Sequence, residues 1–343
     1  MIVSALSSPI RPALAVELLD RAGAWVRGDS RECTPKILVA SQMRGSTDEC
    51  CYSGDFRCCT ETCCFRTLPW VVTVPTRIDL TFSALRSAGR MAFMPFITAG
   101  DPDMATTGAL IRELASRGVD LIEVGFPYSD PIADGPVIQS SYTRALNQKL
   151  TVQDIFNEIA QLDTANLPPL IAMVSYAIVF RLGLETFLQQ AQAAGFAGFI
   201  IPDLPGDEAA EMHALVTHAG LDLIQLVAPT TPPERVRQIV KHSSGFLYCI
   251  AVAGTTGVRD SVAEPLIKQL QWLKQETHLP LAVGFGLSQP AQLGPLRGIA
   301  DGAIVGSAIV RHLEALTQPG ASVADVLRRT GEYAGTMVEA AHR

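Results

Sequence analysis

Residues 105–125 read ATTGALIRELASRGVDLIEVG, and this stretch decides the fold. Its first part, 105–117, carries apolar side chains at helical spacing, and 121–124 is a short, almost wholly apolar run. Gly118 lies between the two parts, where a helix commonly ends in a left-handed residue. The stretch therefore predicts a helix, a turn at glycine and a buried strand.

The same arrangement recurs along the chain. Helical patterns over 184–194 and 208–219 end at Gly195 and Gly220, and each leads into a short apolar run. The expected strands are 93–98, 121–124, 170–174, 199–201, 223–227, 246–251, 281–285 and 303–305. Strands that are apolar on both faces and joined through helices must be parallel and covered on both sides.

Eight such units fit the size of a (β/α)8 TIM barrel, which needs about 250 residues. A doubly wound sheet is the alternative, and it would favour a glycine fingerprint after the first strand. Here that turn, residues 98–102, reads TAGDP instead. We therefore predict a single-domain barrel over residues 76–343.

Composition limits the classes of partner. The chain has 343 residues, a net charge of −7 and only 6% aromatic residues. The charge gives no electrostatic reason to bind nucleic acid or anionic lipid, and the aromatic content leaves little for base stacking. No apolar run reaches the roughly 18 residues of a membrane-spanning helix, so we expect a soluble, cytoplasmic protein that holds any anion by local geometry.

Residues 1–75 differ from the rest of the chain. They hold seven of the eight cysteines, some in adjacent pairs, but no histidine. Zinc sites instead use spaced Cys-x2-4-Cys pairs, and a transit peptide would be poor in acids, whereas this segment has eight. We predict an N-terminal extension over residues 1–75 without stable structure, which is either a non-functional leader or the product of an upstream over-reading of the start codon.

Glu123 is the first candidate for chemistry. It lies within an expected barrel strand, and active sites of such barrels lie at the C-terminal ends of the strands. A carboxylate surrounded by packing is costly without a purpose or a partner, and no basic residue lies on the expected strands. Desolvation should raise its pKa toward neutrality, as a general acid–base requires. A structural acid is the alternative.

Asp134 lies in the loop 127–136, which reads PYSDPIADGP. On its own, Asp-Gly-Pro is a turn signal. Its combination with Glu123 places two carboxyl groups around one strand end and favours a catalytic role.

Small residues follow the last three expected strands, as Gly254-Thr-Thr-Gly257, Gly284-Phe-Gly286 and Gly306-Ser307. Such residues let backbone N–H groups approach an anion, and barrels commonly hold phosphate on these loops. The pattern predicts a phosphate site. The six histidines form no metal-binding spacing, so no metal site is indicated.

Several segments resemble the tryptophan synthase alpha chain family, from about residue 78 to the C-terminus. They are FMPFITAGDP (93–102), LIEVGFPYSDPIADGP (121–136), IPDLP (201–205), GTTG (254–257), GFG (284–286) and GSAI (306–309). The resemblance implies a carbon–carbon lyase of tryptophan biosynthesis that cleaves indole-3-glycerol phosphate to indole and glyceraldehyde 3-phosphate. It implies no metal and no organic cofactor in this chain.

The resemblance also implies residue roles. Glu123 is the expected acid–base, and Asp134 the group that holds the indole N–H. The implied substrate-binding residues are Phe96, Tyr176, Tyr248, Thr256 and Phe285. The implied phosphate-binding residues are Gly257, Gly286, Gly306 and Ser307. For the aromatic residues, core packing is the alternative.

The family implies a partner as well: a beta chain that uses pyridoxal phosphate to join indole to serine, in an alpha2beta2 heterotetramer. The loop with Asp130 and Pro131 is expected to contribute to that contact. Three alternatives remain: a free-standing indole-3-glycerol phosphate lyase, a different phosphate-sugar barrel such as an isomerase, and an inactive barrel that only activates a beta chain. Both carboxyl groups are intact, which argues against the last.

Overall fold

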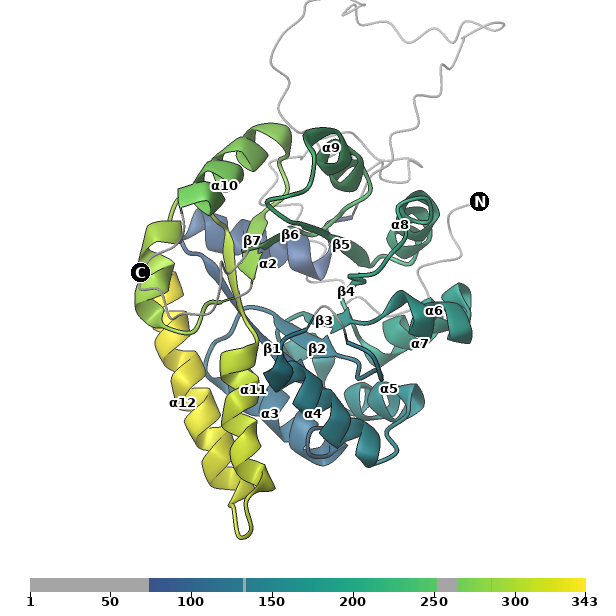
Figure 1. The fold of residues 1–343 in the computed structure, drawn as a ribbon, viewed down its shortest axis with the longest axis vertical. Coiled ribbons are helices and arrows are strands. Elements are labelled where there is room, and N and C mark those ends of the chain that lie inside the picture. Colours follow the sequence, from purple (N-terminus) through teal and green to yellow (C-terminus); the bar gives the residue numbers. More distant parts are fainter. Residues whose placement is uncertain (1–73, 132–133, 252–263, 285) are drawn as a thin grey trace, which may run out of the picture. The chain divides into compact units, whose positions relative to one another are not determined.

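The computed structural model describes residues 74–131, 134–251, 264–284 and 286–343. Eight parallel strands close into a barrel in sequence order, with helices around it (Figure 1). The strands are β1 (Ala92–Thr98), β2 (Ile122–Gly125), β3 (Leu170–Met173), β4 (Gly198–Ile200), β5 (Asp222–Val227), β6 (Leu247–Ile250), β7 (Leu281–Gly284) and β8 (Gly302–Val305). The predicted (β/α)8 barrel is confirmed, and every expected strand is present. The extension 1–75 lies outside the described residues, apart from Val74 and Pro75.

The described α-helices lie before, between and after the strands, with two of them between β2 and β3 and two between β3 and β4. They are α2 (Arg77–Ser87), α3 (Met104–Ser116), α4 (Pro136–Asn147), α5 (Val152–Ala160), α6 (Tyr176–Leu182), α7 (Leu184–Ala194), α8 (Ala209–His218), α9 (Pro233–Lys241), α10 (Glu264–Glu276), α11 (Ser307–Leu313) and α12 (Val323–His342). Between β7 and β8 the connection is a 3-10 helix, Pro290–Leu296, because it contains Pro295, which an α-helix interior tolerates poorly. Within the described residues, no helix is both long and apolar enough to span a membrane.

The opening stretch folds as predicted, with boundaries shifted by one residue. Helix α3 begins after Asp103, whose side chain accepts a hydrogen bond from the Thr106 amide. Gly118 adopts a positive φ of 78°, which allows the chain to leave the helix and enter β2. The helix and the strand are therefore set by local chemistry.

Side chains alternate between two cores along each strand. In β1, Phe93 and Ile97 pack outward against the helices, whereas Met94 joins a core inside the barrel. The register places Phe96 opposite Glu123 of β2, so both residues lie on the inner face. Because the barrel closes, β8 pairs with β1 and brings the two ends of the barrel sequence together.

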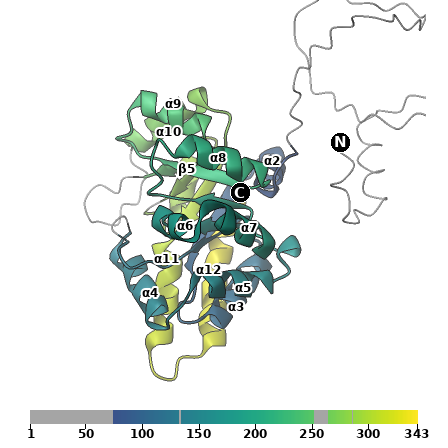
Figure 2. The ribbon, with the colours of Figure 1, turned by 90° about the vertical axis from the view of Figure 1, so that its right-hand side faces the viewer.

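Helix α2 closes the N-terminal end of the barrel, on the side away from α4 (Figure 2). Ile78, Phe82 and Leu85 pack into the inner core, and the Phe82 ring centroid lies 5.6 Å from that of Phe246. With this end filled by hydrocarbon, the other end remains for a ligand.

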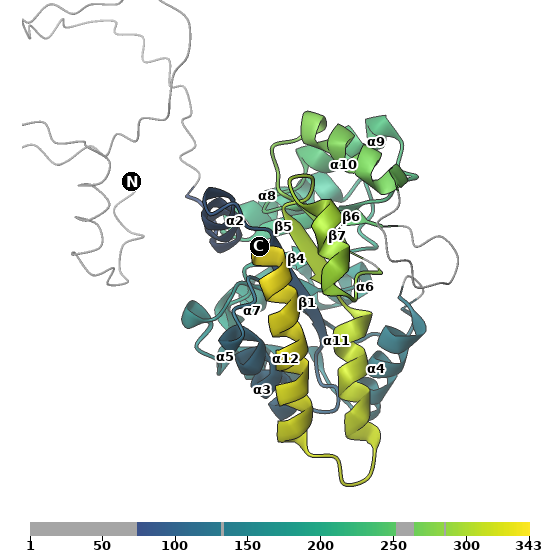
Figure 3. The same cartoon turned by 90° about the vertical axis from the view of Figure 1, so that its left-hand side faces the viewer.

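The two C-terminal helices lie beside each other at the edge of the barrel (Figure 3). Helix α12 packs against both α3 and α11. It thus connects the first half of the barrel with the helix that follows β8.

Candidate active site

A cavity of about 280 Å³ lies at the C-terminal ends of the strands. It brings together seven residues that the sequence analysis singled out. They are Phe96, Glu123, Asp134, Tyr248, Gly286, Gly306 and Ser307. Residues from the start, the middle and the end of the barrel sequence therefore line the same cavity.

Glu123 is fully buried in this wall. Neither of its carboxylate oxygens has a hydrogen-bond partner within the described part of the chain. Asp101 shows the contrast, because it is also buried but forms a 2.6 Å ion pair with Arg144. Burial raises the pKa of Glu123 to about 8, so its carboxyl group is mostly protonated at neutral pH. Among the described residues, no arginine pairs with Glu123.

Asp134 lines the cavity and is held there through its backbone groups. Its amide donates to the Pro131 carbonyl at 3.1 Å, and its carbonyl accepts from Gln139 Nε2 at 2.8 Å. Burial raises the pKa of Asp134 to about 6. At neutral pH the cavity therefore contains one carboxyl that is mostly neutral and one that is mostly ionised, which suits two different chemical roles.

Two glycines make room for aromatic rings inside the barrel. A Cβ on Gly125 would lie 2.4 Å from Cζ of Phe96, and a Cβ on Gly284 would lie 2.2 Å from Oη of Tyr248. Real Cβ atoms do not approach other atoms so closely. Gly284 therefore serves packing of Tyr248, whereas the sequence analysis had grouped it with the phosphate loops.

The loops after β7 and β8 form the far side of the cavity. Gly286 has a positive φ of 85°, and Gly306 and Ser307 lie where α11 begins. Ser288 is fixed from two sides: its amide donates to Gln292 Oε1 at 2.7 Å, and its carbonyl accepts from Tyr333 Oη at 2.9 Å. The C-terminal helix thus anchors a cavity loop.

Not every expected residue reaches the cavity. Tyr176 does not line it; this residue begins α6, where its amide donates to Asp203 Oδ1 at 2.7 Å. Its ring centroid lies 6.1 Å from that of Phe180. Thr256, Gly257 and Phe285 lie outside the described residues, so their roles stay predictions.

The cavity also has walls that the sequence analysis missed. They are Gly135, Ile138, Met173, Leu287, Ser288, Ile304, Ala308 and Arg311. Two of them carried a usable signal. Met173 lies two residues after Ile171, the β3 residue that pairs with Glu123, and so it shares the inner face of the barrel. Arg311 lies four residues after Ser307, one turn further along the helix that begins there.

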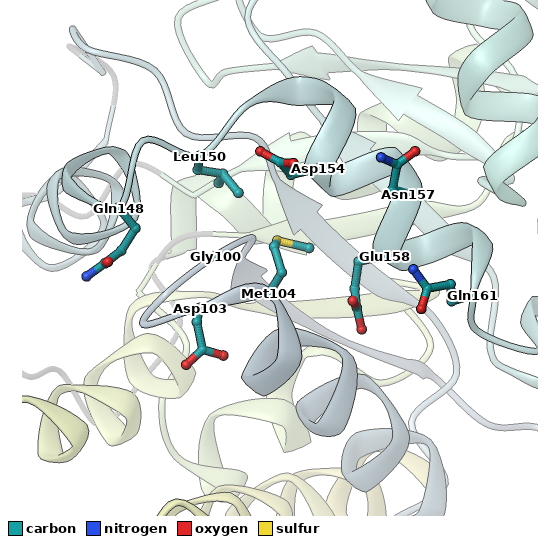
Figure 4. A pocket seen from close by; sticks show the side chains of 9 residues that line it. All are labelled: Gly100, Asp103, Met104, Gln148, Leu150, Asp154, Asn157, Glu158 and Gln161. Atoms are coloured by element: carbon teal, nitrogen blue, oxygen red, sulfur yellow. The ribbon is translucent and has the colours of Figure 1, made fainter.

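A second hollow lies outside the barrel, between the start of α3 and helix α5 (Figure 4). Its acidic side chains include Asp103 and Asp154. Asp103 caps α3, and Asp154 forms a capping box with Thr151 at the start of α5, so both have structural partners. Among the described residues, no cluster of three or more His, Cys, Asp and Glu could hold a metal ion.

The closed parallel barrel, with a buried acid at the C-terminal ends of its strands, defines an enzyme of the (β/α)8-barrel class. The chain belongs to the tryptophan synthase alpha chain family, whose model matches residues 82–342. Cleavage of indole-3-glycerol phosphate is the known role of this family, which confirms the predicted lyase class.

Individual relatives and solved structures support the same family assignment. The tryptophan synthase alpha chain of Rhodopirellula baltica is 43% identical over 264 residues, covering 76% of this chain and 95% of the relative. That of Chloroflexus aggregans is 46% identical over 241 residues, covering 70% and 90%. The crystal structure of the Legionella pneumophila alpha chain matches with a TM-score of 0.68 and 34% identity, covering 78% and 97%.

Proposed function

We propose that this chain cleaves indole-3-glycerol phosphate by a retro-aldol reaction, with Glu123 as acid–base and Asp134 as the group that holds the indole N–H. One observation carries the assignment of roles. Both Glu123 oxygens are buried, with no hydrogen-bond partner among the residues that the structure describes, in a cavity that also contains Asp134, Gly306 and Ser307.

The pKa values of Glu123 and Asp134 support different roles for the two carboxyl groups. Glu123, mostly protonated at neutral pH, delivers its proton to ring carbon C3 of the indole. The ring nitrogen becomes cationic, and the ionised Asp134 stabilises it electrostatically. Asp134 is partly desolvated by burial, so this attraction is stronger than it would be in bulk water.

The second step restores both the ring and the acid. The Glu123 carboxylate accepts the proton of the glycerol hydroxyl next to the bond that breaks. The electrons of that carbon–carbon bond return to the ring and give indole, while the hydroxyl carbon becomes the aldehyde of glyceraldehyde 3-phosphate. Glu123 ends protonated, as it began, so no other co-reactant is consumed.

The other residues of the cavity are proposed to bind the substrate. Phe96 and Tyr248 flank the indole, and the backbone at Gly286, Gly306 and Ser307 holds the phosphate. We assign this chain no cofactor of its own; pyridoxal phosphate belongs to the beta-chain partner.

Docking on a beta chain is proposed for the same end of the barrel. Asp130, which is exposed, follows β2 in the chain. Phe180, with 74% of its surface exposed, lies on α6 directly after β3. An exposed phenylalanine on the helix that follows β3, and so at the C-terminal end of the barrel, suits a protein interface that would receive indole without releasing it to solvent. We expect an alpha2beta2 heterotetramer in the cytoplasm.

An indole-release assay tests the function. The full chain and residues 76–343 are each assayed with and without a beta chain. Weak activity that rises sharply with the beta chain supports the synthase subunit, and equal behaviour of both forms supports a dispensable extension. Brisk activity that ignores the beta chain supports a free-standing lyase. No cleavage under either condition, with beta-chain activation intact, supports the inactive barrel.

Tyr333→Phe tests the anchoring of the cavity loop. Losing the hydroxyl leaves the Ser288 carbonyl without its 2.9 Å donor, and we expect KM to rise about fivefold, the worth of roughly 1 kcal/mol, with kcat nearly unchanged. Steady-state kinetics measures this. Thr336→Val is the control, because among the described residues its hydroxyl donates to a carbonyl of the same helix, Tyr333 O. An equal KM effect in the control would contradict the anchoring role.

A further inference from the structure

We infer that Arg311 is a further substrate-binding residue, whose guanidinium binds the phosphomonoester dianion at the end of the substrate remote from the indole. The inference rests on the proposed function, because it assigns the phosphate to the loops after β7 and β8. It adds a side-chain cation to a site otherwise attributed to backbone groups.

Position is the first argument. Arg311 lines the cavity and lies on α11, which begins at Ser307. Residues four apart on a helix are neighbours on one face, so Arg311 lies one turn behind the residue proposed to meet the phosphate. An arginine side chain is long enough to span that turn.

Charge is the second argument. The described residues that line the cavity include two acids, Glu123 and Asp134, and a single cationic side chain, Arg311. The chain as a whole carries −7. A phosphate dianion that enters this cavity meets the ionised Asp134 and a negative protein, so a cation at the phosphate end would offset the repulsion.

The unused hydrogen-bonding capacity of Arg311 is the third argument. Arginines that already pair with an acid have less capacity for a ligand: Arg144 pairs with Asp101 at 2.6 Å, and Arg237 with Glu276 at 2.9 Å. Within the described residues, the exposed Arg311 has neither an ion pair nor a hydrogen bond. Its planar fork of N–H donors matches phosphate oxygens in pairs, which a lysine cannot reproduce.

Kinetics of Arg311→Gln tests the inference in the full chain with its beta chain. The phosphate does not react, so Arg311 binds substrate and transition state equally. We therefore expect KM to rise at least about tenfold, in the range for a hydrogen bond to a charged group, with kcat within about twofold. Arg311→Lys keeps a point charge without the fork and should recover only part of the affinity.

Arg329→Gln is the matched control. It removes the same charge from an exposed arginine on α12 that does not line the cavity, and its KM should equal that of the wild type. Unchanged KM in Arg311→Gln, or a fall in kcat alone, overturns the inference. So does an equal KM rise in both variants, because that effect would come from net charge.

Binding of glycerol 3-phosphate, measured by calorimetry, separates this inference from the proposed function. We expect weaker binding to Arg311→Gln than to the wild type and to Arg329→Gln, with indole binding equal in all three. If the wild type binds glycerol 3-phosphate in this Arg311-dependent way but cleaves nothing, only the proposed function fails. If it cleaves the substrate and binding ignores Arg311, only this inference fails.

Discussion

Glu123→Gln abolishes indole release, with kcat reduced by about 10⁴-fold, the upper range for a general acid–base. Gln keeps the shape of the side chain but carries no transferable proton, so both proton steps are lost. Because substrate contacts are retained, the affinity for indole-3-glycerol phosphate should stay within about threefold. Single-turnover kinetics and equilibrium binding measure the two quantities separately.

The burial of Glu123 lets this test separate a loss of catalysis from a loss of stability. With a pKa of about 8, the side chain is already mostly neutral at pH 7, so a neutral amide changes the local charge little. The variant should unfold at nearly the wild-type temperature. Glu339→Gln, on the exposed side of α12, is the control and should keep full activity. Turnover above a tenth of the wild type would remove Glu123 from its assigned role.

Asp134→Asn should lower kcat by roughly 10²- to 10³-fold, the cost of losing one electrostatic stabiliser in an enclosed site. The amide oxygen still accepts the indole N–H, but it cannot neutralise the positive charge that develops on the ring nitrogen. We therefore expect a smaller loss than for Glu123→Gln and little change in KM. Asp163→Asn, outside the cavity, is the control.

The pH profile gives Asp134 a second readout. Its pKa is raised to about 6, so the ionised form is present above that pH and is lost as the pH falls through it. Wild-type kcat/KM, which reports the groups of the free enzyme, should therefore decline below pH 6, and above pH 8 as Glu123 loses its proton. Asp134→Asn should lack the acidic decline and keep the alkaline one. A variant that retains the acidic decline would show that another group causes it.

The barrel itself could be predicted from local patterns. A helical stripe, a glycine and a short apolar run repeat along the chain, and each depends only on near neighbours, as Gly118 with its positive φ shows. Glu123 could be found in the same way, since an acid within an apolar strand is anomalous before any tertiary contact is known. Asp134 needed the combination with Glu123, because its own motif is that of a turn.

The sequence by itself determined the class of fold, the buried acid and the glycine-rich ends of the last strands, because each is written in residues close together in the chain. Only the tertiary structure decided which side chains form the cavity wall. It includes Met173 and Arg311 and leaves out Tyr176. It also showed that Gly284 is small because the Tyr248 ring occupies its space. The physical reason is the closure of the barrel. When β8 pairs with β1, residues some two hundred positions apart come into contact, and no local sequence pattern predicts such a contact.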